Sequence, residues 1–308
     1  MQLITESQVT QALQAPAAAL AALRDAFVQL SRGQAAVLAR GRAAAAGGDG
    51  AALMGSAMGA VLAGEPGTQG VMGTKVYSTR NGQFQFVITL FDNATGLPLA
   101  TLEANELTRQ RTSLTTALAV DALAAPDAQV LAIFGAGTQA QAHADVIRPL
   151  RAFRRVLVCA RNGAAAAEFA ARIGAELVDA ATAAREADVI VTATRASEPL
   201  FDGNRVKPGA FVAAVGSSKP VARELDDTLL ARAAQVVVEW LPAAQAEAGE
   251  LVRAAPGVVA PQRLVELGGL LAAPQPRDPQ AITVYKSVGI GLEDIALAHL
   301  AYRQLNKV

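Results

Sequence analysis

The sequence predicts an α/β protein in which a smaller α+β domain with an antiparallel sheet precedes a doubly wound parallel sheet. From Val130 onward, short apolar runs alternate with helix-compatible stretches, which is typical of parallel strands joined by helices. Before that point the apolar runs are joined by short turns such as Asn81-Gly82, which is typical of hairpins. We expect residues 1–115, with 282–308 returning to them, to form the first domain and residues 116–281 the second.

The first domain should open with a helix from about Ser7 to Ser31, followed by a Gly/Ala-rich region. Its strands are expected at Gly73–Tyr77, Phe84–Phe91 and Leu97–Glu103. A helix over Leu107–Leu123 then leads into the second domain. Near the end of the chain, Ile282–Val288 and the helix Leu292–Leu305 lie beyond the alternating pattern. We therefore expect both to complete the first domain.

The second domain should contain six strands in chain order. A length of 308 residues is compatible with two domains, and 52% hydrophobic residues are ample for two cores. The expected strands are Val130–Phe134, Val156–Ala160, Glu176–Val178, Asp188–Thr194, Ala210–Val215 and Gln235–Trp240.

A glycine motif follows the first of these strands. The strand Val130–Phe134 leads into Gly135-Ala136-Gly137-Thr138-Gln139-Ala140 and then a helix-compatible stretch. Gly135 would permit the tight turn, Gly137 would let the backbone approach a phosphate, and Ala140 would let the helix pack closely on the sheet. With a second strand at the expected distance, the pattern predicts a dinucleotide-binding Rossmann fold whose pyrophosphate lies at the helix N-terminus. A purely structural Gly-rich turn is the alternative.

The end of the second strand indicates which dinucleotide binds. NAD-binding folds usually carry an Asp or Glu there, which accepts a hydrogen bond from the ribose 2′-hydroxyl. Here Arg161-Asn162 follows the strand, and a guanidinium can pair with a 2′-phosphate. We therefore expect NADP(H) rather than NAD(H), unless Arg161 is an ordinary solvated turn residue.

Composition argues against several other classes. The formal net charge is zero, and no basic cluster with aromatic residues suggests a nucleic-acid or membrane partner. No apolar run approaches a membrane span, and the start lacks the features of a signal peptide, so we expect a cytoplasmic protein. The single cysteine, Cys159, should be an inert core thiol. His143 and His299 are far apart in the chain, so we expect no metal site.

Four further polar stretches could carry chemistry. They are Arg40-Gly41-Arg42, Lys75 within an apolar strand, Arg109-Gln110-Arg111-Thr112 near a helix start, and Gly216-Ser217-Ser218-Lys219-Pro220 after a strand. A buried lysine is costly unless a negative group meets it, and loops at the carboxyl ends of parallel strands usually face the cofactor. Ordinary surface charges and a structural turn are the alternatives.

Taken together, these residues resemble a known family. The sequence is similar to the ornithine cyclodeaminase/mu-crystallin family over essentially its whole length. The motifs that carry the resemblance are Lys75-Val76-Tyr77, Thr108 to Thr112, Gly135 to Ala140, Arg223-Glu224-Leu225-Asp226, and Lys286-Ser287-Val288-Gly289 followed by Glu293-Asp294. Within the family, Lys75-Val76-Tyr77 running into Asn81-Gly82-Gln83-Phe84 resembles the bacterial reductases of cyclic ketimines. The resemblance implies a dimer formed through the N-terminal domain and a nicotinamide cofactor in the Rossmann domain.

The resemblance also implies roles for individual residues. Lys75 matches the catalytic lysine. The substrate-binding positions are Arg111, which also lies near the cofactor phosphates, Arg42 or less favourably Arg40, Ser218 and Val288. The cofactor-binding positions are Arg111, Thr112, Gly135, Gly137, Thr138, Gln139, Ala140, Arg161, Asn162, Thr194, Val215 and Ser287. Ser218 is a departure, because the deaminating members carry an aspartate there and a serine cannot serve as base and counter-ion.

The expected activity is therefore NADPH-dependent reduction of a cyclic ketimine carboxylate, Δ1-pyrroline-2-carboxylate or Δ1-piperideine-2-carboxylate, to L-proline or L-pipecolate. Arginines would hold the carboxylate, and Lys75 would supply the proton that the nitrogen needs as hydride reaches the imine carbon. The alternatives are an NAD-dependent ornithine cyclodeaminase, a reductive aminase of small 2-oxo acids, and a non-catalytic NADPH-binding protein like mu-crystallin.

Overall fold

The computed structural model describes residues 1–48, 51–64 and 69–307. The chain divides into two compact units, and the division cuts the long helix α3 (Asn105–Leu123). Unit 1 comprises Met1–Thr115 and Ile290–Val308, and unit 2 comprises Thr116–Gly289.

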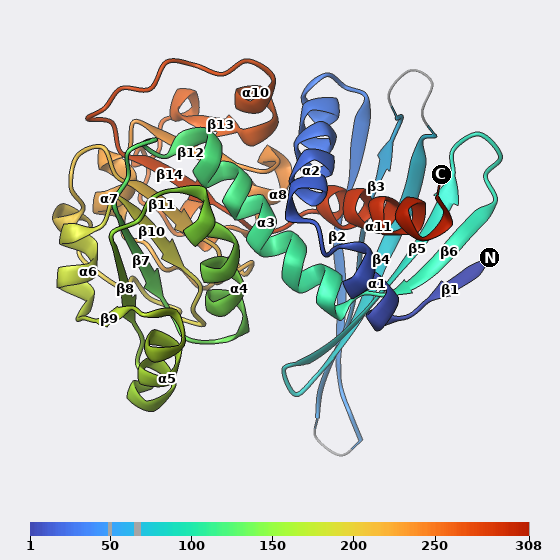
Figure 1. Ribbon diagram of the computed structural model, residues 1–308, viewed down its shortest axis with the longest axis horizontal. Helices are drawn as coiled ribbons and strands as arrows, with labels where there is room; N and C mark the ends of the chain where they lie inside the picture. The colour runs from blue at the N-terminus through green and yellow to red at the C-terminus, as the bar shows by residue number, and fades with distance from the viewer. Residues whose placement is uncertain (49–50, 65–68, 308) are drawn as a thin grey trace. The chain divides into compact units, whose positions relative to one another are not determined.

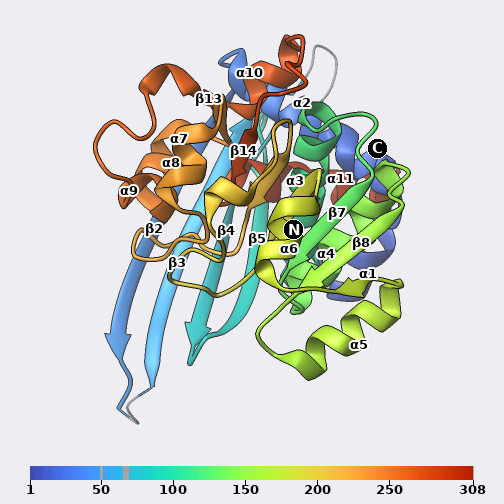
Figure 2. The same cartoon turned by 90° about the vertical axis from the view of Figure 1, so that its left-hand side faces the viewer.

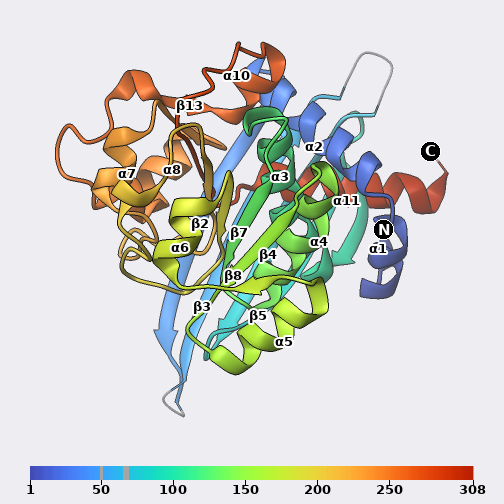
Figure 3. The same cartoon turned by 60° about the vertical axis from the view of Figure 1, so that its left-hand side comes forward.

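Unit 1 is built on a six-stranded sheet with the order β1-β6-β5-β4-β3-β2. Neighbouring strands are antiparallel except for β1 and β6, which run parallel. Figures 2 and 3 show β2 to β5 running side by side as long strands. The strand bounds are β1 (Gln2–Ile4), β2 (Ala35–Ala46), β3 (Ala52–Leu62), β4 (Val71–Arg80), β5 (Gln83–Asp92) and β6 (Pro98–Glu103).

The C-terminal helix α11 (Gly291–Asn306) packs on one face of this sheet, against β2 to β5 (Figure 1). Its first residue approaches β3 so closely that a Cβ on Gly291 would lie 2.3 Å from the carbonyl oxygen of Gly59. Only glycine fits there without moving the backbone. Helices α1 (Glu6–Ala12) and α2 (Pro16–Ser31) also pack against α11. Helix α11 thus belongs to the same compact unit as the first 115 residues.

One sequence-based expectation for unit 1 was wrong, and three of its strands were not expected. The single helix expected over Ser7–Ser31 is two helices, because Pro16 opens α2 and the residue before a proline is biased away from helix. The Gly/Ala-rich region contains β2 and β3, whose alanines and glycines have low strand propensity. The short strand β1 was also missed, since three residues carry almost no periodic signal.

Unit 2 contains an eight-stranded parallel sheet with the order β13-β12-β14-β11-β10-β7-β8-β9. The chain order reverses between β7 and β10, which is the topological switch point of a Rossmann fold. The bounds are β7 (Val130–Phe134), β8 (Arg155–Cys159), β9 (Glu176–Leu177), β10 (Val189–Thr192), β11 (Phe211–Ala214), β12 (Gln235–Val238), β13 (Leu264–Glu266) and β14 (Thr283–Lys286). The predicted α/β class with a separate antiparallel sheet is confirmed.

Strand β14 corrects the expected assignment of 282–308 to the first domain. It lies between β11 and β12, so unit 2 extends to Gly289 and the return to unit 1 begins at Ile290. Val284 and Tyr285 are fully buried there. A strand inserted late into the middle of a sheet pairs with neighbours that are distant in the chain, so the local pattern did not indicate its partners.

Helices cover both faces of the parallel sheet. Figure 1 shows α6 and α7 on one face and α4 on the other. Ala183 of α6 and Leu229 of α7 share a core with Ile190 and Val212 of the strands. The bounds are α4 (Thr138–Ile147), α5 (Gly163–Ile173), α6 (Ala180–Glu186), α7 (Asp227–Arg232), α8 (Leu241–Glu247), α9 (Gly249–Val252) and α10 (Leu267–Ala272).

Candidate active site

The turn between β7 and α4 has the geometry that a dinucleotide pyrophosphate requires. Gly135 has φ +114°, and a Cβ there would lie 2.6 Å from the Ala193 carbonyl oxygen, so the turn needs glycine. Gly137 is the N-cap of α4, and the position where its Cβ would lie is open, with nothing within 4 Å. Ala140 is fully buried where the helix meets the strand. These residues fit a pyrophosphate, which Gly137 and the first amides of α4 would hold.

The first turn of α4 supplies further polar groups. Gln139 has a buried side-chain oxygen without a hydrogen-bond partner among the described residues. Its backbone carbonyl lies 2.7 Å from Nδ1 of His143, whose Nε2 lies 3.0 Å from the Thr116 hydroxyl. Burial lowers the pKa of His143 to about 4, so this imidazole is neutral at pH 7. His143 therefore braces the helix from within and carries no charge towards a ligand.

After β8, the side chain of Asn162 caps α5 by accepting the Ala165 amide at 3.2 Å. Arg161 is exposed, and within the described ranges no carboxylate forms an ion pair with it. A solvated guanidinium at this position is compatible with pairing to a 2′-phosphate.

A buried carboxylate joins two strand ends at the carboxyl edge of the parallel sheet. Glu224 is fully buried and accepts four hydrogen bonds. One oxygen accepts from the Thr192 hydroxyl and the Gly216 amide, both at 2.8 Å. The other accepts from the amide and hydroxyl of Thr194, at 2.8 and 2.7 Å. Glu224 thus fixes the segments that follow β10 and β11, where Thr194, Val215 and Ser218 were expected to meet the cofactor or the substrate.

A second buried acid, Glu250, connects neighbouring segments of the same edge. Glu250 pairs with the Lys286 ammonium at 3.0 Å and accepts the Glu224 amide at 2.8 Å. The Lys286 ammonium also donates to the Ser217 carbonyl oxygen at 2.8 Å. Sequence reasoning assigned no role to these three side chains, although Glu224 and Lys286 lie in quoted motifs.

The segment after β14 is held by Glu239. Its carboxylate accepts the Ser287 hydroxyl and the amides of Val288 and Gly289, the last two at 2.9 and 3.1 Å. Glu239 directly follows β12, and an acid in an apolar run that ends a strand was the available signal for it. The Ser287 hydroxyl donates to this carboxylate, so it reaches a ligand only as an acceptor.

In unit 1, the structure brings the predicted catalytic lysine together with the predicted carboxylate-binding arginine. Lys75 on β4 is 1% exposed and Arg111 on α3 is 7% exposed. Asp294 of α11 lies between them, with one oxygen 2.7 Å from the Lys75 ammonium and the other 3.2 Å from Nε of Arg111. Arg111 also pairs with Glu293 at 2.8 Å. The four side chains form a buried cluster of two positive and two negative charges.

Lys75 lies in surroundings that favour proton release. Burial lowers the pKa of its ammonium to about 8, Asp294 opposes this by attraction, and Arg111 and Arg40 add to it by repulsion. The Phe86 ring centroid lies 5.3 Å from the ammonium and that of Tyr77 lies 5.8 Å away. At neutral pH the ammonium is mostly protonated, yet it is a far better acid than an exposed lysine.

A bulge in β2 bears on the choice between Arg40 and Arg42. The pairing of β2 with β3 shifts between Leu38 and Gly41, so Arg40 donates to the Met58 sulfur at 3.4 Å while Arg42 pairs with Ser56. Met58 and Ser56 are both buried on the face that carries Lys75. The bulge therefore places both arginines on that face, with Arg40 in the row of Lys75 and Arg42 in the next row.

The Thr112 hydroxyl, which was expected to contact the cofactor, donates to its own helix at the Thr108 carbonyl, at 2.9 Å.

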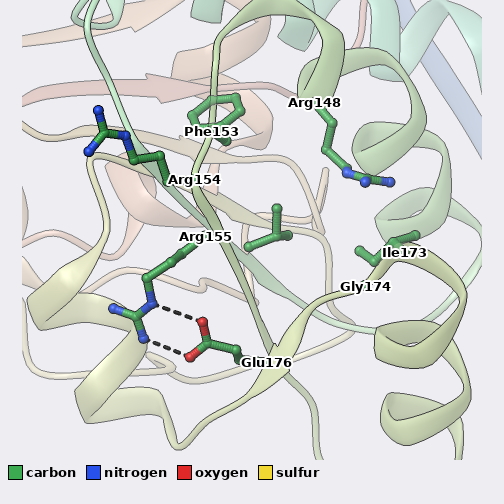
Figure 4. Close-up of a pocket in the computed structure, with 8 residues that line it drawn as sticks. Arg148, Phe153, Arg154, Arg155, Ile173, Gly174 and Glu176 are labelled. Carbon is green, nitrogen blue, oxygen red and sulfur yellow. Dashed lines mark hydrogen bonds and ion pairs between the residues drawn. The ribbon is translucent and has the colours of Figure 1, made fainter.

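One cavity among the described residues lies away from these groups. It measures about 230 Å³ and lies at the amino ends of β8 and β9, opposite the edge that carries Gly135 (Figure 4). Arg155, which lines the cavity, forms a bidentate ion pair with Glu176. Because this cavity and Gly135 lie at opposite edges of the sheet, the cavity is not part of the candidate dinucleotide site. In the described part of the chain, no three potential metal ligands gather, and no helix has the length and apolarity to cross a membrane.

Comparisons with known proteins agree with these features. The model of the ornithine cyclodeaminase/mu-crystallin family matches residues 2–307. The mouse ketimine reductase mu-crystallin is 36% identical over 224 residues, 71% of this chain and 69% of that protein. A probable ornithine cyclodeaminase from Bordetella pertussis has a similar crystal structure, with TM-score 0.92, 44% identity and coverage of 100% of this chain and 97% of that one.

A further solved structure is relevant to both candidate sites. The Δ1-pyrroline-2-carboxylate reductase of Thermococcus litoralis, in complex with NADH and L-proline, has TM-score 0.88, 26% identity and coverage of 100% and 98% of the two chains. The match to the family model spans both units and contains all the motifs described above. The chain therefore belongs to the ornithine cyclodeaminase/mu-crystallin family.

Proposed function

We propose that the protein is an NADPH-dependent reductase of cyclic ketimine carboxylates, acting on Δ1-pyrroline-2-carboxylate, Δ1-piperideine-2-carboxylate or both, and forming L-proline or L-pipecolate. The observation that carries the proposal is the buried cluster in which Lys75 and Arg111 meet. One group can donate a proton, the other can bind a carboxylate, and both are kept from bulk water. The names of the mouse and Thermococcus relatives support the same reaction class.

The side chains of unit 1 would bind and protonate the substrate. Arg111 would pair with the substrate carboxylate, helped by Arg40 or Arg42 on the same face as Lys75. When bound, the reduced nicotinamide supplies a hydride to the imine carbon. The ring nitrogen becomes basic during reduction, and Lys75, with its pKa of about 8, would give it a proton. A positioned acid of this kind contributes roughly 10²–10⁴ in rate.

Arg161 supports NADPH over NADH as the cofactor. Its exposed guanidinium follows β8, where NAD-binding folds carry an acid for the ribose hydroxyl. Arg161→Asp should raise the KM for NADPH much more than the KM for NADH. Equal effects on both would assign Arg161 to solvent. The Thermococcus enzyme was solved with NADH, so both cofactors belong in the assay.

The decisive experiment follows NADPH oxidation by the purified protein with Δ1-pyrroline-2-carboxylate or Δ1-piperideine-2-carboxylate. Rapid oxidation that yields the cyclic amino acid would support the proposal, and Lys75→Met should abolish it while NADPH binding stays near normal. Retention of most of the rate in Lys75→Met would refute the role of Lys75. Ammonium release from ornithine with NAD⁺ would instead indicate a cyclodeaminase, despite the serine at position 218. Tight NADPH binding without turnover would indicate a non-catalytic binder.

We also propose that the protein is a homodimer joined through the sheet of unit 1. Leu38, Val76 and Val87 lie on the face opposite Lys75 and are 55%, 53% and 42% exposed. Val76 and Val87 are direct cross-strand neighbours, and exposed apolar side chains gathered on one face are typical of a protein interface. Val76→Glu should convert a dimer to a monomer in sedimentation experiments, whereas Leu177→Glu, at an exposed leucine of unit 2, should not. A wild-type monomer would refute the proposal.

A further inference from the structure

Asp294 contacts both the proposed proton donor, Lys75, and the proposed carboxylate-binding residue, Arg111. It is fully buried in the first turn of α11, and its two oxygens face Lys75 and Arg111. The close approach of Gly291 to β3 brings this turn down onto the sheet. The position of Asp294 therefore depends on how the Gly291 backbone packs on β3, and a larger residue at position 291 would disturb it.

We propose that Asp294 is a positioning residue that orients the Lys75 ammonium and keeps it protonated until the substrate nitrogen takes the proton. This inference rests on the proposed role of Lys75 as the acid. Asp294 itself would not bind substrate; it would act through the ammonium that it holds.

The surroundings of Lys75 explain why one carboxylate matters so much. Strands β3 and β5 present Met58 and Ile88 beside it, and the rings of Tyr77 and Phe86 lie close to the ammonium. Three charged groups act on the ammonium: Arg40 of β2, Arg111 of α3 and Asp294 of α11. Burial and both arginines favour the neutral amine, and Asp294 alone among these groups favours the ammonium.

Glu293 provides a matched control in the same helical turn. It is also fully buried and also pairs with Arg111, at 2.8 Å. Its other contacts are with the Thr115 hydroxyl at 3.2 Å and with the Ile290 amide at 3.0 Å, which caps α11. Removing its charge should disturb the arginine and the helix start, while the ion pair between Asp294 and Lys75 remains.

The experiment compares pH profiles of kcat for the wild type, Asp294→Asn and Glu293→Gln. In the wild type, the rate should fall above a pH of about 8, where Lys75 loses its proton. Asp294→Asn should move this basic limb down by about one pH unit or more, because an adjacent opposite charge shifts a pKa by roughly 1–3 units. For a shift of one unit, the loss should be roughly fivefold at pH 8 and less than twofold at pH 6, and a larger shift should increase the loss at pH 8 most. Glu293→Gln should raise the substrate KM and leave the basic limb in place.

A readout independent of activity separates this inference from the proposed function. Lysine side chains labelled with ¹³C at Cε report the Lys75 titration by NMR, with Lys75→Met identifying the signal. A lower titration midpoint in Asp294→Asn, restored in Asp294→Glu, would support the inference even if no imine is reduced. An unchanged midpoint, or an equal loss of rate at every pH, would overturn it. If Asp294→Asn fails to fold, Asp294→Ala decides, since it also removes the carboxylate and should also lower the midpoint.

Discussion

Replacing Lys286 by methionine tests whether the buried charges of unit 2 hold its carboxyl edge together. Lys286 and Glu250 are both 0% exposed and pair at 3.0 Å. Methionine keeps most of the side-chain volume but leaves the Glu250 carboxylate buried without its cation, although the hydrogen bond from the Glu224 amide remains. It also removes the donor to the Ser217 carbonyl. Breaking a buried pair from one side costs about 3–5 kcal/mol. For a unit of this size, the Tm should fall by roughly 6–20 °C.

The assay is thermal unfolding, with an exposed ion pair as the control. Arg155 pairs with Glu176 at a shorter distance, 2.7 Å, but the two side chains are 41% and 51% exposed. Arg155→Met should change the Tm little, because water screens such pairs. The double variant Lys286→Met/Glu250→Gln should recover part of the loss, since no unpaired charge stays buried. If Lys286→Met is no more destabilising than Arg155→Met, our reasoning about burial is wrong.

Two further predictions concern packing and pH. Gly291→Ala should destabilise unit 1 by about 1–3 kcal/mol, because its Cβ would meet the Gly59 backbone, whereas Gly55→Ala has open space and should change little in denaturant unfolding. His143 has a pKa lowered to about 4 by burial, below its ordinary 6.5, so its contribution to stability is complete above pH 6.5 and is lost as the pH falls towards 4. When the pH is lowered from 7 to 4.5, the free energy of unfolding should fall less in His143→Gln than in the wild type, by roughly 2–3 kcal/mol. Equal losses in the two proteins would contradict this prediction.

The Rossmann unit was the easier part to predict from sequence. The apolar run before Gly135 matches β7 residue for residue, because a fully buried parallel strand is a continuous apolar run that ends abruptly. The strands β2 and β3 were harder, since alanine and glycine give no strand signal. Strand β2 pairs with β3 and β3 pairs with β4, and both pairings are tertiary contacts that no local pattern reports.

The candidate site was predictable only in part for a related reason. Lys75 was conspicuous as a charge in an apolar strand, and a buried ammonium requires a negative partner. The partner, Asp294, lies at the other end of the chain, and its motif was noticed without a role. The choice between Arg40 and Arg42 stayed open because residues two apart in a strand share a face, so alternation cannot separate them. The bulge in β2 decides only which face of the sheet they occupy.

The buried acids of unit 2 illustrate one physical requirement. A carboxylate is costly to take out of water unless several donors meet it, and Glu224 meets four while Glu239 meets the Ser287 hydroxyl and two amides. The donors to Glu224 lie at the end of β10 and in the segments after β10 and β11, whereas these donors to Glu239 all lie in the segment after β14. Such a carboxylate fixes loop geometry that apolar packing alone would leave adaptable, since its hydrogen bonds are directional. The requirement for exact loop placement at a candidate site explains why a chain with only 18% charged residues places so many of its acids inside.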